Sequence, residues 1–312
     1  MIKINFNQEL FDKHIESISK KLKSHIETID KTSLLEETNE CLEHLKNEKE
    51  LKNLLRATSE QLKYYIDFFE KEFPNSIGVD NQKEEDWTEL YRVLRKEIFE
   101  KEYSNWSSRS KEYGAYEFVK SLDLKTCPYC NRNYTFVVDN ESGKLRPEID
   151  HFYPKSKYPF LAMSFLNLIP SCQICNHTKS NKVKKNLINP YDIKDGDFTF
   201  TYTPKSVDFI EVENQKYNFD SFEIELKYNQ NNQDNIALFK LKELYAQHKD
   251  IVLELLIKKA YYPQSYIDEL SKFEFSQDEI YRYLFSNYKK EQDLHKRPLS
   301  KLIKDITQEL GI

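Results

Sequence analysis

The segments Cys127-Pro128-Tyr129-Cys130 and Cys172-Gln173-Ile174-Cys175 each hold two cysteines separated by two residues. Together they supply four thiolates, which is the ligand set of a closed tetrahedral zinc site. Disulfide bonds are the alternative, but they are rare in the cytoplasm, where we expect this chain to lie. Four sulfur ligands leave no position open for water. The predicted zinc is therefore structural, and it stabilises a module too small to hold a firm core alone.

Polar residues beside these cysteines suit the hydrolysis of a phosphodiester bond. His151 can be neutral near pH 7 and can accept a proton from water, so it is a candidate general base. The carboxylate of Asp150 and the amide oxygen of Asn176 are hard ligands, which suit Mg²⁺ or Mn²⁺ rather than zinc. Such an ion would stabilise the scissile phosphate and the departing 3′ oxygen. The predicted cofactors are structural Zn²⁺ and catalytic Mg²⁺ or Mn²⁺.

The order of these residues resembles that of the HNH nucleases, in which an acid and a His are followed by an Asn, and then by an Asn or His that opens a helix. The resemblance covers about residues 121–190 and implies the ββα-metal fold. It implies that Asn167, in the middle position, braces the loop carrying His151 by hydrogen bonds. His177 is the alternative to Asn176 as a metal ligand. We prefer Asn176 because the family uses the position directly after the second cysteine pair.

Basic residues gather in this part of the chain, although the chain as a whole is acidic. The net charge is −5, whereas residues 144–185 hold eight basic and two acidic side chains, a local charge of +6. A phosphate-facing site and an ordinary solvated face both account for this pattern. Lys179 lies three residues beyond Asn176 on the same side of the expected helix, so it is a candidate phosphate ligand, together with Lys182. Glu148 either orients a neighbouring side chain or lies on the surface.

Longer segments are similar to the Septu-type HNH nucleases of bacterial anti-phage defence. They read Cys-Pro-Tyr-Cys-Asn-Arg at 127–132, Glu-Ile-Asp-His-Phe-Tyr-Pro-Lys at 148–155, Cys-Asn-His-Thr-Lys-Ser at 175–180, and Arg-Pro-Leu-Ser-Lys-Leu with Asp-Ile at 297–306. Proteins of that group work with an ABC-type ATPase, and some relatives accompany retrons. The resemblance implies a nuclease effector with an ATPase partner. The chain itself has no Gly-x-x-x-x-Gly-Lys-Ser/Thr loop for holding phosphates, so we do not expect it to hydrolyse ATP.

The surrounding sequence predicts a mainly α protein with the small α+β zinc-stabilised module in its middle. Glycine is scarce, with only 5 residues, which favours long helices. Apolar residues recur at helical spacing in 8–29 and 34–66, and Thr32 or Ser33 is the expected N-cap of the second stretch. Cys41, alone on an apolar stripe, is expected in the core.

The other predicted elements follow from local patterns. In chain order they are a helix over about 87–99, strands over 133–138 and 145–151 joined by a turn at 139–144, a short strand over 167–171, a helix from 173 or 175 to about 185, a hairpin of 199–203 with 222–228, and about three helices from 236 onward. We predict three regions. They are a helical region 1–120 that is a candidate for partner docking, the nuclease module 121–190, and a C-terminal region 191–312.

The leading hypothesis is a metal-dependent endonuclease, with DNA as the expected substrate. One alternative is a non-catalytic, zinc-stabilised subunit that binds nucleic acid or acts as a scaffold, which the acidic overall charge favours. Another is a stand-alone restriction-type nuclease, but the flanks carry no recognisable DNA-reading motif. No run of about 18 apolar residues is present, and the first residues do not resemble a secretory signal, so we expect a cytoplasmic protein without a membrane span.

Overall fold

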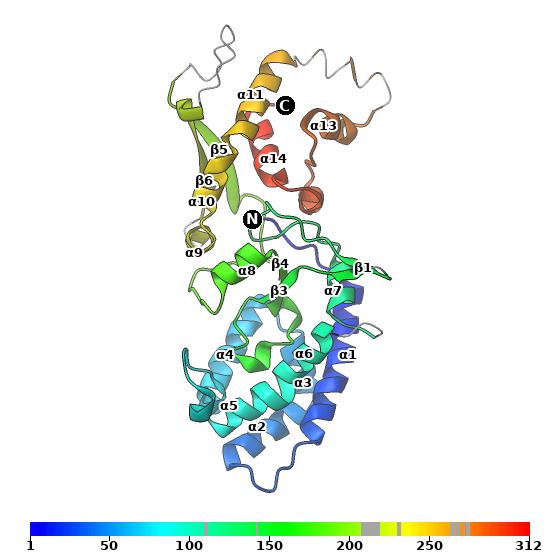
Figure 1. The fold of residues 1–312 in the computed structure, drawn as a ribbon, viewed down its shortest axis with the longest axis vertical. Coiled ribbons are helices and arrows are strands. Elements are labelled where there is room, and N and C mark those ends of the chain that lie inside the picture. Colours follow the sequence, from blue (N-terminus) through cyan, green and yellow to red (C-terminus); the bar gives the residue numbers. More distant parts are fainter. Residues whose placement is uncertain are drawn as a thin grey trace. The chain divides into compact units, whose positions relative to one another are not determined.

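Four helices follow one another in the N-terminal part of the chain, where the apolar spacing predicts them. They are α1 (Gln8–Glu27), α2 (Glu36–Lys46), α3 (Glu48–Leu55) and α4 (Ser59–Glu72), drawn from blue to cyan in Figure 1. The computed structural model describes residues 1–108, 112–141, 143–206, 219–229, 232–262, 265, 269–270, 272 and 275–312. Among these residues, no helix is both long enough and apolar enough to cross a membrane.

Side-chain caps set three of these helix starts, by Asn7 for α1, Asn47 for α3 and Thr58 for α4. Asn7 caps α1 by accepting a hydrogen bond from the backbone N–H of Leu10 at 3.0 Å. The predicted cap of α2 is wrong, because that helix begins after Leu35, which makes no side-chain cap bond. Thr32 instead donates its backbone N–H and its hydroxyl to Asp30, so its side chain closes a turn rather than a helix.

The helix expected over 87–99 is longer than predicted. It consists of α5 (Glu89–Arg92), the π-helical turn η3 (Val93–Phe99) and α6 (Glu100–Ser108), and α7 (Ala115–Leu122) comes after it. The stretch before it holds only the short 3₁₀ turns η1 (Pro74–Ser76) and η2 (Glu84–Asp86). A π-helical turn is rare and is often found at functional sites.

Two small hairpins and a short helix follow in the middle of the chain. They are β1 (Val138–Asn140) with β2 (Gly143–Leu145), β3 (Glu148–His151) with β4 (Leu168–Ser171), and α8 (Gln173–Lys179). The 3₁₀ turns η4 (Pro159–Leu161) and η5 (Phe165–Asn167) lie between β3 and β4.

The strand pairing differs from the prediction. Residues 133–138 and 145–151 do not form one long hairpin, because β3 pairs with β4 instead, placing His151 opposite Leu168. The reason is burial: β4 is buried throughout and β3 nearly so, whereas β1 and β2 are wholly exposed. Helix α8 also ends six residues earlier than expected, where Ser180 takes a φ of 49° and leaves the helical conformation.

The C-terminal part contains the predicted hairpin and then helices. Strands β5 (Phe198–Pro204) and β6 (Phe222–Tyr228) pair antiparallel along their whole length, and the 3₁₀ turn η7 (Phe219–Ser221) precedes β6. The helical elements that follow are α9 (Gln233–Leu238), α10 (Leu241–Tyr245), η9 (Ala246–His248), α11 (Lys249–Tyr261), α13 (Gln277–Phe285), η10 (Glu291–Lys296) and α14 (Ser300–Glu309).

These elements form two compact units. We call Asn5–Asp123 with Phe136–Val183 the helical unit, and Met1–Ile4 with Leu124–Thr135 and Lys184–Ile312 the terminal unit. Both units are assembled from separate stretches of chain. The division into regions 1–120, 121–190 and 191–312 stays a prediction.

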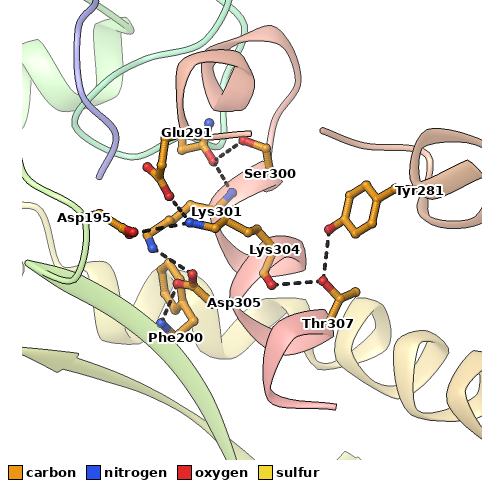
Figure 2. A network of polar contacts seen from close by, with 10 residues as sticks. Asp195, Phe200, Tyr281, Glu291, Ser300, Lys301, Lys304, Asp305 and Thr307 are labelled. Atoms are coloured by element: carbon orange, nitrogen blue, oxygen red, sulfur yellow. Dashed lines mark hydrogen bonds and ion pairs between the residues drawn. The ribbon is translucent and has the colours of Figure 1, made fainter. Parts of the chain in front are cut away.

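A buried polar network holds the C-terminal helix within the terminal unit (Figure 2). Lys301 donates from its ammonium group to Asp305 at 2.7 Å, and Asp305 also accepts from the backbone N–H of Phe200 at 2.9 Å. The side-chain oxygen of Asn131 accepts from the backbone N–H of Lys301 and from the hydroxyl of Ser300, both at 3.0 Å. The segment 297–306 is therefore packed inside this unit.

Candidate functional site

The four cysteines of the two Cys-x-x-Cys segments lie together. The sulfur atoms of Cys127, Cys130, Cys172 and Cys175 are within 4.8 Å of one another, and all four residues are buried. None of the chain's five cysteines forms a disulfide, so no disulfide competes for these sulfur atoms. The geometry and the donor set fit a structural zinc ion. Cys41 is buried in α2, as its apolar stripe predicts, and burial raises the pKa of its thiol.

The local backbone explains how each cysteine pair is presented. The first pair lies in a tight turn in which the N–H of Asn131 donates to the carbonyl of Cys127 at 2.7 Å. The N–H of Arg132 donates to the sulfur of Cys130 at 3.4 Å, and such donation favours the thiolate form that a metal needs. In the second pair, Cys172 is the N-cap of α8 and Cys175 lies in its first turn.

His151 ends strand β3 and is buried. Its Nε2 atom lies 3.0 Å from the carbonyl oxygen of Ala162. A carbonyl oxygen can only accept, so Nε2 carries the ring proton and Nδ1 is left with the free lone pair. Burial, and secondarily the charge of Lys155, lower the pKa of His151 to about 3. The imidazole is therefore neutral near pH 7, with Nδ1 as its proton-accepting atom.

Asp150 and Lys179 form a buried ion pair next to this ring. The ammonium of Lys179 lies 3.1 Å from a carboxylate oxygen of Asp150 and donates to the carbonyl of His151 at 2.6 Å. The two side chains are only 4% and 1% exposed. Burial lowers the pKa of Lys179, and the charge of Asp150 opposes that shift. Sequence analysis expected Lys179 to face phosphate, but the structure buries it beneath the site.

Asn167 is buried and spans the loop that follows His151. Its side-chain oxygen accepts from the N–H of Tyr153 at 2.7 Å, and its amide group donates to the carbonyls of Tyr153 at 3.0 Å and Leu161 at 2.9 Å. These three bonds join both ends of the loop, which is the geometry that a bracing residue requires.

Asn176 and His177 both contact Glu148. The amide nitrogen of Asn176 donates to Glu148 at 2.7 Å, and Nε2 of His177 lies 3.5 Å from the other oxygen of the same carboxylate. Because the amide nitrogen faces Glu148, the amide oxygen of Asn176 is the atom suited to a cation. His177 is largely exposed, with 64% of its side chain accessible. Glu148 thus orients the residue that the sequence proposes as a metal ligand.

A cavity of about 510 Å³ collects these groups. Its lining includes Asp150, His151, Asn176 and His177, and also Tyr103 and Lys155. The lining does not include Asn167, Lys179 or Lys182. The side chain of Lys182 is exposed and donates to the carbonyl of Thr178 at 2.9 Å. Sequence analysis did not select Tyr103 or Lys155 as site residues. Lys155 entered only as a member of the basic region and of the 148–155 segment, and Tyr103 belongs to a distant helix without a motif of its own.

Comparisons with known proteins give one partial similarity. Over 66 residues, which are 20% of this chain, the sequence is 39% identical to the Septu protein PtuB of Bacillus thuringiensis. The match spans 23% of that relative, so it links only a segment of the two proteins. No protein-family model matches the chain. No solved structure matches it either.

Proposed function

We propose that this chain is a metal-dependent endonuclease of the HNH type that hydrolyses phosphodiester bonds, with DNA as the first substrate to test. The observation that carries the proposal is the neutral imidazole of His151, with Nδ1 as acceptor, in one cavity with Asp150 and Asn176. A proton acceptor beside two oxygen donors is what hydrolysis of a phosphodiester requires.

Each side chain has a separate role in this proposal. His151 takes a proton from the attacking water at Nδ1, and the water oxygen forms the new bond to phosphorus as the 3′ oxygen leaves. Asp150 and Asn176 would hold Mg²⁺ or Mn²⁺, which supplies positive charge for the phosphate and the leaving oxygen. Lys179 orients the Asp150 carboxylate, and Glu148 orients the amide of Asn176. The zinc that fits the four cysteines has no part in the chemistry.

We further propose that the nuclease acts in anti-phage defence. The partial similarity to the Septu protein PtuB supports that setting. An ABC-type ATPase is the proposed partner, and a retron is a further proposed component of the assembly. The net charge of −5 agrees with a need for such a partner, because an acidic chain binds nucleic acid poorly on its own.

Cleavage assays test the proposal directly. Supercoiled plasmid and single-stranded RNA would be incubated with the full chain and Mg²⁺ or Mn²⁺, alone and with proteins that co-purify with it. We expect cleavage that EDTA stops, and a loss of about 10²–10⁴-fold in His151→Ala. Asn176→Ala should lose more activity than His177→Ala if Asn176 is the ligand. A His151→Ala protein that cleaves like the parent would remove the assignment of the base.

A non-catalytic role is the second candidate, and one contact favours it. Asp150 is already neutralised by Lys179 at 3.1 Å, so the site is electrostatically satisfied without a cation. A protein that binds nucleic acid equally well in EDTA and in Mg²⁺, and that forms no cut product with any divalent ion, would be a binding or scaffolding subunit.

A further inference from the structure

Tyr103, which lines the cavity, belongs to α6 and is far from the motif residues in sequence. The ring of Tyr103 in this helix packs edge-on against the ring of His151, with centroids 4.6 Å apart and an angle of 62°. The hydroxyl of Tyr103 lies 3.4 Å from the carbonyl oxygen of Ile149, two residues before His151. Tyr103 therefore contacts both the strand that presents the imidazole and the imidazole itself.

The Tyr103 ring is held in place from its other sides. The ammonium of Lys155 lies 5.4 Å from the ring centroid, and Lys155 is ion-paired with Glu100, which precedes Tyr103 by three residues on α6. The ring of Trp106, which is fully buried, lies 6.0 Å from that of Tyr103. A ring confined in this way has little rotational freedom, so it can restrict the ring that it touches.

The π-helical turn before α6 makes this arrangement possible. Arg95 donates to Glu100 at 2.7 Å, a pair separated by five residues. In an α-helix such residues lie about 140° apart around the axis, so they would not meet. In η3 the backbone N–H of Glu100 bonds to the carbonyl of Arg95, which brings positions i and i+5 to one side. The same turn thus directs Glu100 toward Lys155.

A second contact ties this helical segment to the loop after His151. The hydroxyl of Tyr91 donates to the carbonyl of Ser156 at 2.6 Å and accepts from Arg95 at 2.7 Å. Gly78 packs against the same point, because a Cβ atom there would lie 2.1 Å from the Ser156 carbonyl oxygen. The segment 91–103 therefore contacts both the loop next to the site, through Tyr91, and the imidazole of His151, through Tyr103.

We propose that Tyr103 is a positioning residue of the nuclease, which fixes the His151 ring so that Nε2 faces Ala162 and Nδ1 is available as the base. The proposal rests on the nuclease function proposed above. It assigns a role in catalysis to the N-terminal helices, which the motif residues alone do not include. Tyr103 itself touches neither the attacking water nor the phosphate in this role.

The test compares three substitutions at Tyr103 with a matched tyrosine elsewhere. Tyr103→Leu removes the ring, Tyr103→Met fills the space with an unbranched chain, and Tyr103→Phe keeps the ring. Tyr64→Leu is the control, because Tyr64 lies on α4 with 62% of its surface exposed. We expect Tyr103→Leu and Tyr103→Met to lower kcat by about 10²-fold with KM changed by less than about 2-fold, since a misplaced base loses rate and not binding. Tyr103→Phe should recover most of the loss.

A measurement independent of activity accompanies the kinetics. Nitrogen-15 NMR of histidine-labelled full-length protein reports which ring nitrogen carries the proton, and the His151 signals are assigned by their absence in His151→Ala. The parent and Tyr103→Phe should show a single Nε2–H form at His151, and Tyr103→Leu a mixture of forms. The signals of His14, which is held by Tyr113 and Met163, serve as the check that each variant is folded.

The outcomes separate the two proposals. An unchanged His151 tautomer in folded Tyr103→Leu and Tyr103→Met, or an unchanged kcat in both, overturns the positioning role. If the parent protein cleaves nothing, the nuclease function is overturned. If the variants nevertheless show mixed tautomers of His151, Tyr103 still orients that ring, but without a role in catalysis.

Discussion

Each of the two units contains a buried Lys–Asp ion pair, and the surroundings of the two pairs differ. In the terminal unit, Lys301 and Asp305 are four residues apart on α14, at 2.7 Å. In the helical unit, Lys179 of α8 reaches Asp150 of β3 at 3.1 Å. The first pair is local and is completed by a backbone N–H from Phe200. Asp305 and Asp150 each line a cavity, of about 540 Å³ and 510 Å³. The second pair differs because it joins two elements and lies beside a neutral imidazole. The same pair of residue types is structural in one place and suited to chemistry in the other.

The difference shows that a buried ion pair indicates a functional site only together with its surroundings. Burying an ion pair costs desolvation energy that the attraction between the charges only partly offsets. Asp305 shows this cost directly, because burial raises its pKa although Lys301 opposes the shift. Asp305 contacts Lys301 within α14 and joins this helix to β5 through the backbone N–H of Phe200. Next to Asp150, Lys179 also bonds the carbonyl of His151, and within the described part of the chain Nε2 of that ring, not Nδ1, is the atom held by a hydrogen bond.

Metal removal should give the largest effect on this comparison. Helix α8, which carries Lys179, has seven residues, too few for a stable helix without outside support. If the four cysteines hold zinc, stripping it should cost on the order of 10 kcal/mol of folding free energy. We expect zinc in the purified protein, faster amide exchange in α8 after chelation, and loss of cleavage.

Cys41→Ala is the matched control for the metal prediction, because Cys41 is buried but lies outside the cluster. It should retain zinc and cleavage, whereas Cys175→Ser should lose both. A parent protein that contains no zinc, and whose thermal unfolding is indifferent to chelators, would contradict the assignment.

Breaking the structural pair should give the next largest effect. Asp305→Ala leaves the buried ammonium of Lys301 and the backbone N–H of Phe200 without their acceptor, so we expect a loss of about 3–5 kcal/mol in the free energy of unfolding, measured with urea. The double variant Lys301→Met with Asp305→Leu removes both charges and should recover most of that loss. If Asp305→Ala unfolds at the parent's urea midpoint, the buried pair does not contribute to stability.

Breaking the pair at the site should lower cleavage as well as stability, because it also leaves a buried ammonium, that of Lys179, without its counter-charge. Asp150→Asn removes a proposed metal ligand, and we expect kcat to fall by about 10²–10³-fold, as for the loss of one group that stabilises transition-state charge. Asp305→Ala, compared at temperatures where both variants are folded, should leave kcat unchanged. Equal losses of kcat in the two variants would show that the two pairs do not differ in function.

Motifs in the sequence predict part of this picture well. The spacing of the cysteines predicts their clustering, because two turns of fixed geometry can present four sulfur atoms to one ion. The helices of the N-terminal part and the hairpin of β5 with β6 follow from their apolar periods. Each of these signals is local in the chain, so the pattern itself contains the information.

The rest depends on contacts between distant residues. The partner of β3 is decided by which strands are buried, and the turn at 139–144 misleads because a good turn sequence can close a hairpin of only three residues per strand. Lys179 reads as a surface charge in a basic region, and only its contact with Asp150 shows that it is buried. Tyr103 carries no motif, and its contact with His151 depends on a π-helical turn that apolar spacing does not reveal.

Acid should separate the two units with the smallest of these effects. His14 in α1 is buried, with Nδ1 at 2.8 Å from the hydroxyl of Tyr113 and Nε2 at 2.7 Å from the carbonyl of Met163. Burial lowers its pKa from 6.5 to about 4. Below pH 6.5 the unfolded chain binds a proton here that the folded chain does not, so stability falls as the pH falls. From pH 7 to pH 5 we expect His14 to remove about 2 kcal/mol from the helical unit.

Asp305 should act with the opposite sign in the terminal unit. Because its folded pKa is raised, its charging destabilises the fold as the pH rises, and lowering the pH from 7 toward 4 relieves that cost. Hydrogen exchange measured by mass spectrometry at pH 7 and pH 5, corrected for intrinsic rates, compares peptides of α1 with peptides of α14. From pH 7 to pH 5, the protection of α1 should fall in the parent and fall less in His14→Gln. The protonation of Asp305 should not lower the protection of α14 over the same range. If the protection of α1 falls as much in His14→Gln as in the parent, the acid sensitivity comes from other groups. The next residue to substitute would then be His151, because burial lowers the pKa of its imidazole in the same direction.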